Sequence, residues 1–314
     1  MYRRSEEPSP TEVCCYWKKS ILSRVGNELK IVKIKDIATK KNKMDNDADN
    51  LENNGFLNSV LQYKDKHTFN SHLIRFFKPD FYQKFSLHYC SVSYAADKQD
   101  SNNFIKYCSS LLTDKNCTEI MNATRDQSKS MLWHELRYAR ITASKLYEAS
   151  QCKTFHGSLL ESIMGGKVFS TYAMQRGSTL EHLVLDKIQK FLGKPVTKVG
   201  LTLNAKYPML GASPDGETDD AVIEIKCPNS DKAVTRYYDK GMIQTKYKAQ
   251  MQLQMFFAKK HVGYFCIANP EFEKNGKVMI IKDTYSEKFL TPIIKRAVKF
   301  WETAVFPILM KNNH

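Results

Sequence analysis

Two neighbouring stretches of this 314-residue sequence decide its fold: GASPDG at residues 211–216 and VIEIKCP at residues 222–228. The second stretch has the composition of a strand, in which side chains alternate between two faces. Glu224 and Lys226 therefore share one face, while the two isoleucines share the other. We expect one face of this strand to join a core and the other to carry chemistry.

The segment before this strand has strong turn composition, with Asp-Gly followed by Thr-Asp-Asp. We expect strands near 208–213 and 221–227 to pair as a hairpin-like unit, which brings Asp215 beside Glu224. Two carboxylates in a small space cannot both stay ionised without a compensating cation. Oxygen ligands suit a hard divalent ion such as Mg²⁺ or Mn²⁺ and not zinc. Each residue alone has an ordinary structural interpretation, but their combined spacing and type favour a metal site.

These residues resemble the signature of the PD-(D/E)XK nuclease superfamily, here Pro214-Asp215 followed by Glu224-Ile225-Lys226. They are most similar to the branch that contains phage lambda exonuclease and the YqaJ viral recombinases. Three further segments occur in the order that this branch requires: WHELR with RITAS within 133–144, RGSTLEH at 176–182 and YKAQMQ at 247–252. The resemblance covers about residues 130 to 310. It implies a restriction-endonuclease-like fold and a Mg²⁺-dependent deoxyribonuclease.

The resemblance also implies a role for each matching residue. The implied ligands of one or two Mg²⁺ or Mn²⁺ ions are the carboxylates of Glu181, Asp215 and Glu224 and the backbone carbonyl of Ile225. Lys226 is implied to lie beside the attacking water, where it lowers the pKa of the water or balances charge on the phosphate. Gln250, on a helix expected over about 239–259, is implied to orient a water or a phosphate oxygen. Glu181 falls on an amphipathic helix pattern.

Three positions are similar to the pocket that holds a terminal 5′-phosphate in the phage enzyme: Arg137, Ser144 and Ser213. An arginine offers a planar fork to phosphate oxygens, and serine hydroxyls complete the shell. Their presence favours a 5′ to 3′ exonuclease on double-stranded DNA ends, acting in recombination or replication of a virus or mobile element. Two alternatives stay open: an endonuclease of the same fold, and a catalytically inactive DNA-binding or interaction module. Intact metal-site residues weigh against the inactive module.

Composition agrees with a polyanionic partner. The formal net charge of +15 and a pI near 9.3 attract nucleic acids, although membrane surfaces would feel the same field. The sequence contains no apolar run of about twenty residues, and its first residues lack an apolar signal core. We expect a soluble intracellular protein, in the nucleus or cytoplasm of a host cell.

Several other chemistries are disfavoured by the motifs that the sequence lacks. The eight cysteines show no Cys-x-x-Cys spacing, which argues against zinc and iron–sulfur ligation. The sequence has no Gly-x-Ser-x-Gly elbow and no phosphate-binding Gly-x-x-x-x-Gly-Lys-Ser/Thr loop. A nucleophilic serine hydrolase and an ATP-driven motor are therefore disfavoured.

The domain organisation follows from shifts in composition. We expect an N-terminal extension over 1–128, partly helical, with a linker near 39–55 that is almost free of apolar side chains. The nuclease domain is expected over 129–314. The phage enzyme has no counterpart of this long extension, so the trimeric ring that the resemblance implies is left open for this chain. A single-strand annealing protein is a further implied partner.

The remaining pattern completes an α/β core with a central mixed sheet flanked by helices. Residues 263–268 and 277–282 have the composition of two further strands, and residues 285–311 repeat apolar side chains at helical spacing. Residues 104–112 show a helical face within the N-terminal part.

Overall fold

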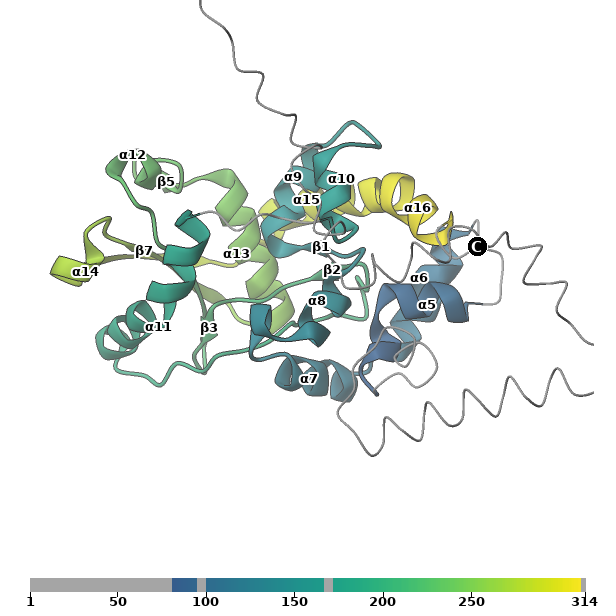
Figure 1. Cartoon of the computed structure of the whole chain (residues 1–314), viewed down its shortest axis with the longest axis horizontal. Helices are drawn as coiled ribbons and strands as arrows, with labels where there is room; N and C mark the ends of the chain where they lie inside the picture. The colour runs from purple at the N-terminus through teal and green to yellow at the C-terminus, as the bar shows by residue number, and fades with distance from the viewer. Residues whose placement is uncertain (1–80, 95–99, 167–171, 312–314) are drawn as a thin grey trace, which may run out of the picture. The chain divides into compact units, whose positions relative to one another are not determined.

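The structure, a computed structural model, describes residues 81–94, 100–166 and 172–311 (Figure 1). These residues all fall in one compact unit, Pro79–His314. The expected linker at 39–55 lies outside the described residues. Among the described residues no helix combines the length and apolar composition needed to cross a bilayer.

A four-stranded mixed sheet forms the centre of the unit. Its order is β3 (Gly216–Glu217), β4 (Ala221–Lys226), β7 (Val262–Ala268) and β8 (Val278–Thr284). The β4 and β7 strands are parallel, while β3 and β8 run antiparallel to their neighbours. The two strands expected after the motifs are confirmed as β7 and β8, to within two residues at each end. The predicted fold class, α/β with a central mixed sheet flanked by helices, is confirmed.

One helix covers each face of the sheet. Leu180, Val184 and other apolar residues of α11 (Tyr172–Leu192) pack against Ile223 and Ile225. On the opposite face, α13 (Thr245–Ala258) packs over β4 and β7 and also supplies the crossover that a parallel strand pair requires. The face of β4 that carries Glu224 is therefore also covered, because α13 packs over the residues expected to be catalytic.

The predicted hairpin partner of β4 is wrong. Residues Leu210–Gly211 form β2, which pairs in parallel with β1 (Ile141–Thr142) and not with β4. Ala212 exchanges two backbone hydrogen bonds with Thr202, so this segment is already paired when the chain reaches Pro214. The chain then turns into β3, whose Gly216 lies opposite Ile223.

Gly216 is thus a strand residue and not the turn residue that Asp-Gly predicts. A Cβ there would lie 2.7 Å from the Val196 side chain, so only glycine fits this close approach. The turn follows at Thr218, whose N–H donates to the carbonyl of Ala221 (2.9 Å) and whose hydroxyl accepts from the Ala221 N–H.

The predicted helix over 239–259 begins later than expected. Its first residues form a two-stranded hairpin, β5 (Tyr238–Asp239) with β6 (Met242–Ile243), and α13 follows. Lys240 and Gly241 at the hairpin turn both have positive φ, 48° and 81°, which suits a primed two-residue turn.

The other described elements are mostly helical. In chain order they are η2 (Gln83–Phe85), α5 (Leu87–Ser93), α6 (Ser101–Leu111), α7 (Asp114–Ala123), η3 (Gln127–Lys129), α8 (Met131–Arg137), η4 (Ala143–Lys145), α9 (Leu146–Gln151), α10 (Ser158–Ile163), α12 (Asp231–Val234), α14 (Phe272–Asn275), α15 (Glu287–Phe300), the π-helical turn η5 (Trp301–Val305) and α16 (Phe306–Lys311). The α15 helix packs against α9 (Figure 1). The expected C-terminal helix is therefore confirmed, with a π-helical turn inside it. The boundary at residue 128 stays a prediction.

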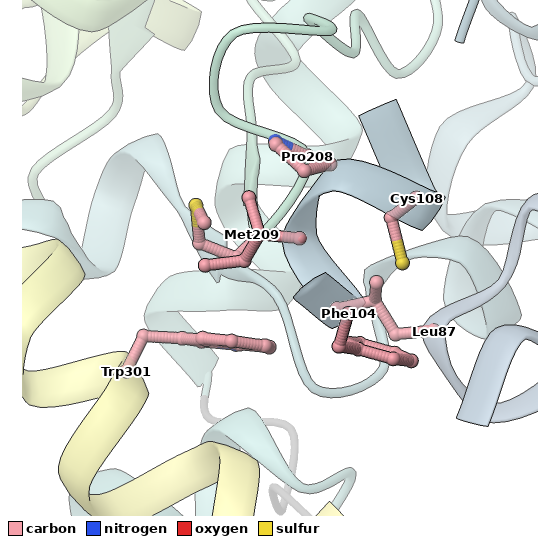
Figure 2. A pocket seen from close by; sticks show the side chains of 7 residues that line it. Leu87, Phe104, Cys108, Pro208, Met209 and Trp301 are labelled. Carbon is pink, nitrogen blue, oxygen red and sulfur yellow. The ribbon is translucent and has the colours of Figure 1, made fainter. Parts of the chain in front are cut away.

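An apolar junction joins the early helices to the C-terminal ones (Figure 2). Phe104 of α6 stacks on Trp301 with ring centroids 6.4 Å apart, and Met209 lines the same junction. The space between these side chains is too small for a water molecule, so this is packing and not a ligand site. The indole N–H of Trp301 donates to the carbonyl of Ala139 (2.7 Å), which anchors the chain just before β1.

Candidate active site

Asp215 joins the sheet through its main chain. Its N–H donates to the carbonyl of Ile223 (3.0 Å), and its Oδ2 accepts from the N–H of Ile225 (2.6 Å). Asp215 therefore lies beside Glu224, which sits between these isoleucines on β4. Burial raises the pKa of Asp215 well above its usual value, and the charges of Glu224 and Glu181 raise it further. The cluster holds more negative charge than the neighbouring lysine balances.

The carboxylate of Glu224 is held by three donors. Its Oε1 accepts from Lys226 Nζ and from Gln250 Nε2 (2.6 Å), and its Oε2 accepts from Gln254 Nε2 (2.6 Å). The residue is only 2% exposed. Both oxygens are therefore oriented, and the three donors compensate this carboxylate for its loss of contact with water.

Lys226 is the cation of this cluster. Burial lowers its pKa, but the charges of Glu224 and Asp215 outweigh burial and raise the pKa above its usual value. Its Nζ also lies 5.6 Å from the centroid of the Tyr247 ring. Lys226 can therefore supply positive charge beside the two carboxylates.

Glu181 approaches from α11, on the other side of the sheet. Its side chain is 29% exposed, and its Oε1 accepts from Lys198 Nζ at 3.1 Å. It is close enough for its charge to raise the pKa of Asp215. The structure thus brings the three predicted carboxylates into one electrostatic cluster, with Lys198 as an additional counter-ion.

A buried arginine fixes α11 against the end of β4. The guanidinium of Arg176 donates to the carbonyls of Cys227 (3.0 Å), Pro228 (2.7 Å) and Pro270 (2.9 Å). It also forms a 2.8 Å ion pair with Glu273. These bonds fix the position of α11, which carries Glu181, relative to β4, which carries the other site residues.

The donor chemistry fits a hard divalent cation. The three carboxylates and the backbone carbonyl of Ile225 offer oxygen only. Burial raises the pKa of Asp215, the charges of Glu224 and Glu181 raise it further, and a cation would oppose both effects. Across the described ranges, however, no group of three or more His, Cys, Asp and Glu side chains is arranged to hold a metal. In the pairs Glu181–Lys198 and Glu224–Lys226, a carboxylate oxygen is directed toward a lysine.

Two residues of the predicted phosphate pocket, Arg137 and Ser213, both contact Trp133. The Arg137 guanidinium lies over the ring of Trp133, with Cζ 3.6 Å from the centroid, and Trp133 Nε1 donates to Ser213 Oγ (3.0 Å). Burial lowers the pKa of Arg137 to about 10, so the group remains a cation at neutral pH.

Ser144 is less closely connected. Its hydroxyl pairs with Thr142 Oγ1 (3.2 Å), and the described hydrogen bonds do not join it to Arg137 or Ser213. Thr142 and Gly211 nevertheless lie opposite each other in the parallel pair β1–β2. Ser144 follows Thr142 by two positions and Ser213 follows Gly211 by two, so both serines leave the same end of this strand pair. Arg140 stabilises this region by donating hydrogen bonds to the carbonyls of Pro208 (2.9 Å), Phe85 (2.7 Å) and Leu136.

Three residues that contact this site were not among its predicted residues: Gln254, Trp133 and Lys198. Gln254 and Trp133 carried a usable signal, because each lies four positions from a predicted site residue on the same helix, Gln250 and Arg137. Lys198 carried none, since its pairing with the α11 carboxylate depends on the tertiary fold.

Part of this chain is similar to a known family model and to a curated relative. Residues 132–261 match the model of the YqaJ-like viral recombinase domain, a span that includes every predicted site residue. The alkaline nuclease of Human herpesvirus 7 (strain JI) is 36% identical over 104 residues, which is 32% of this chain and 21% of the relative. The match thus spans about a fifth of that relative's length. The resemblance to the YqaJ branch that the motifs indicated is confirmed.

Two solved structures are also similar. An alkaline exonuclease from Laribacter hongkongensis is 24% identical, with a TM-score of 0.48, over 58% of this chain and 97% of that one. The Shutoff and Exonuclease Protein of Kaposi's sarcoma-associated herpesvirus is 12% identical, with a TM-score of 0.43, over 67% of this chain and 78% of that one.

Proposed function

We propose that this chain, which contains a YqaJ-like viral recombinase domain, is a Mg²⁺-dependent deoxyribonuclease that degrades double-stranded DNA from 5′ ends. The observation that carries the proposal is the cluster of buried Glu224 with partly buried Asp215 and Lys226 at one end of β4. An excess of partly buried carboxylates beside one lysine suits phosphodiester hydrolysis, where negative charge must be both positioned and balanced.

The acidic residues and the lysine of this cluster are proposed to have different roles. Asp215, Glu224, Glu181 and the carbonyl of Ile225 would hold Mg²⁺ or Mn²⁺, which supplies Lewis-acid stabilisation of phosphate oxygens and a water of lowered pKa. Lys226 would balance charge that develops on the scissile phosphate. We assign Gln250 to orienting Glu224, since its amide donates to Oε1; an additional contact to a water or a phosphate oxygen stays a prediction.

The pocket residues support end-dependent cleavage. Arg137, held flat against Trp133, offers a guanidinium fork to a terminal phosphate, and Ser213 lies at the other edge of the same indole. Ser144 would complete this pocket from the β1 side. Because Ser213 is two residues from Asp215 in sequence, a phosphate held there would lie near the carboxylate cluster.

Digestion of labelled DNA tests the proposal. Linear duplexes labelled at the 5′ end of either strand, and closed circular DNA, would be incubated with Mg²⁺ and with EDTA. We expect Mg²⁺-dependent release of 5′-labelled mononucleotides from linear DNA and an intact circle. Nicking of the circle would favour an endonuclease of this fold, and binding without cleavage would favour an inactive module.

Variants test the site itself. Lys226→Ala should reduce cleavage by roughly 10²- to 10³-fold, the usual effect of removing one group that stabilises charge in the transition state. DNA binding should remain. Asp219→Asn is the control, because Asp219 lies in the exposed turn before β4 and pairs with Lys194, not with a residue of the site. Undiminished cleavage by the Lys226 variant would contradict the site assignment. The trimeric ring, an annealing partner and the place of action in a host cell stay predictions.

A further inference from the structure

Gln254 lies in the site without an assigned role. It is 1% exposed on α13, one helical turn after Gln250, and its Nε2 donates to Glu224 Oε2 at 2.6 Å. The two glutamines thus hold different oxygens of the same carboxylate. Rotation of Glu224 about its terminal bond would break both contacts.

The same amide reaches the phosphate-pocket segment. Gln254 Nε2 is also 3.5 Å from the backbone carbonyl of Ser213, whose hydroxyl accepts from Trp133. Gln254 is therefore in contact with both halves of the site: the β4 carboxylate and the loop that leads to Asp215. Because one nitrogen makes both contacts, a shift of Glu224 or of Ser213 would alter the contact between Gln254 and the other residue.

The orientation of the amide is forced. The opposite orientation would place Oε1 of Gln254 against Glu224 Oε2, acceptor against acceptor. In the forced orientation Oε1 is buried and has no hydrogen-bond partner among the described residues. An unpaired buried carbonyl lowers stability, so this side chain is not optimised for folding alone.

Gln252 on the same helix shows the contrast. It is fully buried, and its Nε2 donates to Asp283 Oδ2 (2.9 Å) and to the carbonyl of Thr284 (2.7 Å). Its Oε1 accepts from the N–H of Ser286 (2.7 Å). Every polar atom of this amide is paired away from the carboxylate cluster, as expected of a structural glutamine.

We propose that Gln254 is a positioning residue that holds the Glu224 carboxylate in register with the Ser213 loop, so that the metal ligands and the bound 5′-phosphate keep a fixed separation. The inference rests on the proposed function, whose metal and phosphate sites it connects. It extends that function by naming the contact through which recognition of a DNA end and metal binding depend on each other.

The test compares Gln254→Met with Gln252→Met. Both remove a buried amide from α13 at similar side-chain volume, so both lower stability. We expect Gln254→Met to weaken Mn²⁺ binding, measured by titration without DNA, by roughly 10- to 100-fold, as for other residues that orient metal ligands. It should also reduce the preference for 5′-phosphorylated over 5′-hydroxyl ends, measured by duplex binding in EDTA and by cleavage. Gln252→Met should leave both quantities unchanged.

Thermal unfolding checks that each variant is folded. If Gln254→Met does not fold, Gln254→Asn replaces it, since asparagine keeps the amide but is one methylene too short to reach Glu224. A folded Gln254 variant with wild-type Mn²⁺ affinity and end preference would overturn the inference, as would equal decreases in the Gln252 variant. A wild-type protein that binds Mn²⁺ yet cleaves no DNA would instead contradict the proposed function, and the Mn²⁺ comparison would still decide the role of Gln254.

Discussion

The indole N–H of Trp133 donates a 3.0 Å hydrogen bond to Ser213 Oγ, joining two residues that are 80 positions apart in the chain. The same ring supports the guanidinium of Arg137 on its face. One side chain therefore sets the positions of two groups that are proposed to hold a terminal phosphate. Trp133 offers no charge of its own, so its contribution is to positioning.

The Trp133→Phe variant separates these two interactions. Phenylalanine keeps an aromatic face under Arg137 but has no N–H to donate to Ser213. We expect the ratio of cleavage rates at 5′-phosphorylated and 5′-hydroxyl ends to fall about five-fold, because one hydrogen bond contributes about 1 kcal/mol. Arg137→Ala should lower the same ratio further, since it removes the charge.

Trp301→Phe is the matched control. Trp301, like Trp133, is buried, and its N–H donates to the carbonyl of Ala139, outside the phosphate pocket. Its substitution should lower the melting temperature and leave the end preference intact. The pocket assignment would be refuted by an equal ratio in the wild type, the Trp133 variant and the Arg137 variant.

Asp215→Asn should abolish cleavage and yet stabilise the metal-free protein. The folded protein raises the pKa of Asp215, so it binds the proton more tightly than the unfolded chain does. Above the usual pKa of an aspartate, stability therefore falls as pH rises toward the raised pKa. Asparagine carries no charge, and its Oδ1 can still accept from the N–H of Ile225.

Thermal unfolding in EDTA at pH 8 measures this effect. We expect the variant to melt at a higher temperature, by roughly 2–4 °C for each kcal/mol of repulsion removed in a domain of this size. Adding Mg²⁺ should stabilise the wild type and not the variant. Asp219→Asn, in the exposed turn, should leave the melting temperature near that of the wild type. A lower melting temperature for Asp215→Asn would mean that the carboxylate cluster is not repulsive.

The local part of this site could be predicted from the sequence. Alternation along a strand is a backbone property, so the shared face of Glu224 and Lys226 followed directly from their spacing. The strand that pairs with β4 did not follow, because the competing partners of β2 are distant in sequence. In the segment before Pro214, Gly211 pairs with Thr142 and Ala212 pairs with Thr202. Neither pairing can be recognised from the sequence of the segment itself.

Burial of the chemical face was also beyond the sequence. The residues of α13 show little amphipathic pattern, because one side of this helix packs on the sheet and another on α9 and α15. A helix buried on several sides can place Gln250 and Gln254 against a carboxylate without showing a separate polar face in its sequence. The identity of the hydrogen-bond partners therefore required the tertiary structure.

Arg176→Lys should destabilise the protein more than loss of a charge would explain. Lysine keeps the charge but cannot reach the three carbonyls and the carboxylate that the guanidinium fork bonds. Because each hydrogen bond to a carbonyl contributes about 1 kcal/mol, we expect the free energy of unfolding, measured with urea in EDTA, to fall by roughly 3 kcal/mol. Glu273→Gln should change it by less than about 1 kcal/mol, because Glu273 is half exposed. Wild-type stability of the lysine variant would show that these hydrogen bonds do not hold α11 to β4.

Lys198→Met should strengthen metal binding, because Lys198 competes with the cation for Glu181. The pair is partly exposed and contributes about 1 kcal/mol or less, so the gain in Mn²⁺ affinity should not exceed about five-fold. The gain should shrink at high salt, where the ion pair is already screened.

Lys194→Met provides the control for this last comparison. Lys194 is a partly exposed lysine four positions away that pairs with Asp219 and Asp220, carboxylates outside the cluster. Both substitutions remove one positive charge from the same segment, so any general change in the field affects both variants alike. A gain confined to Lys198→Met would identify Glu181 as a ligand, whereas equal affinities in the two variants would remove Glu181 from the metal site.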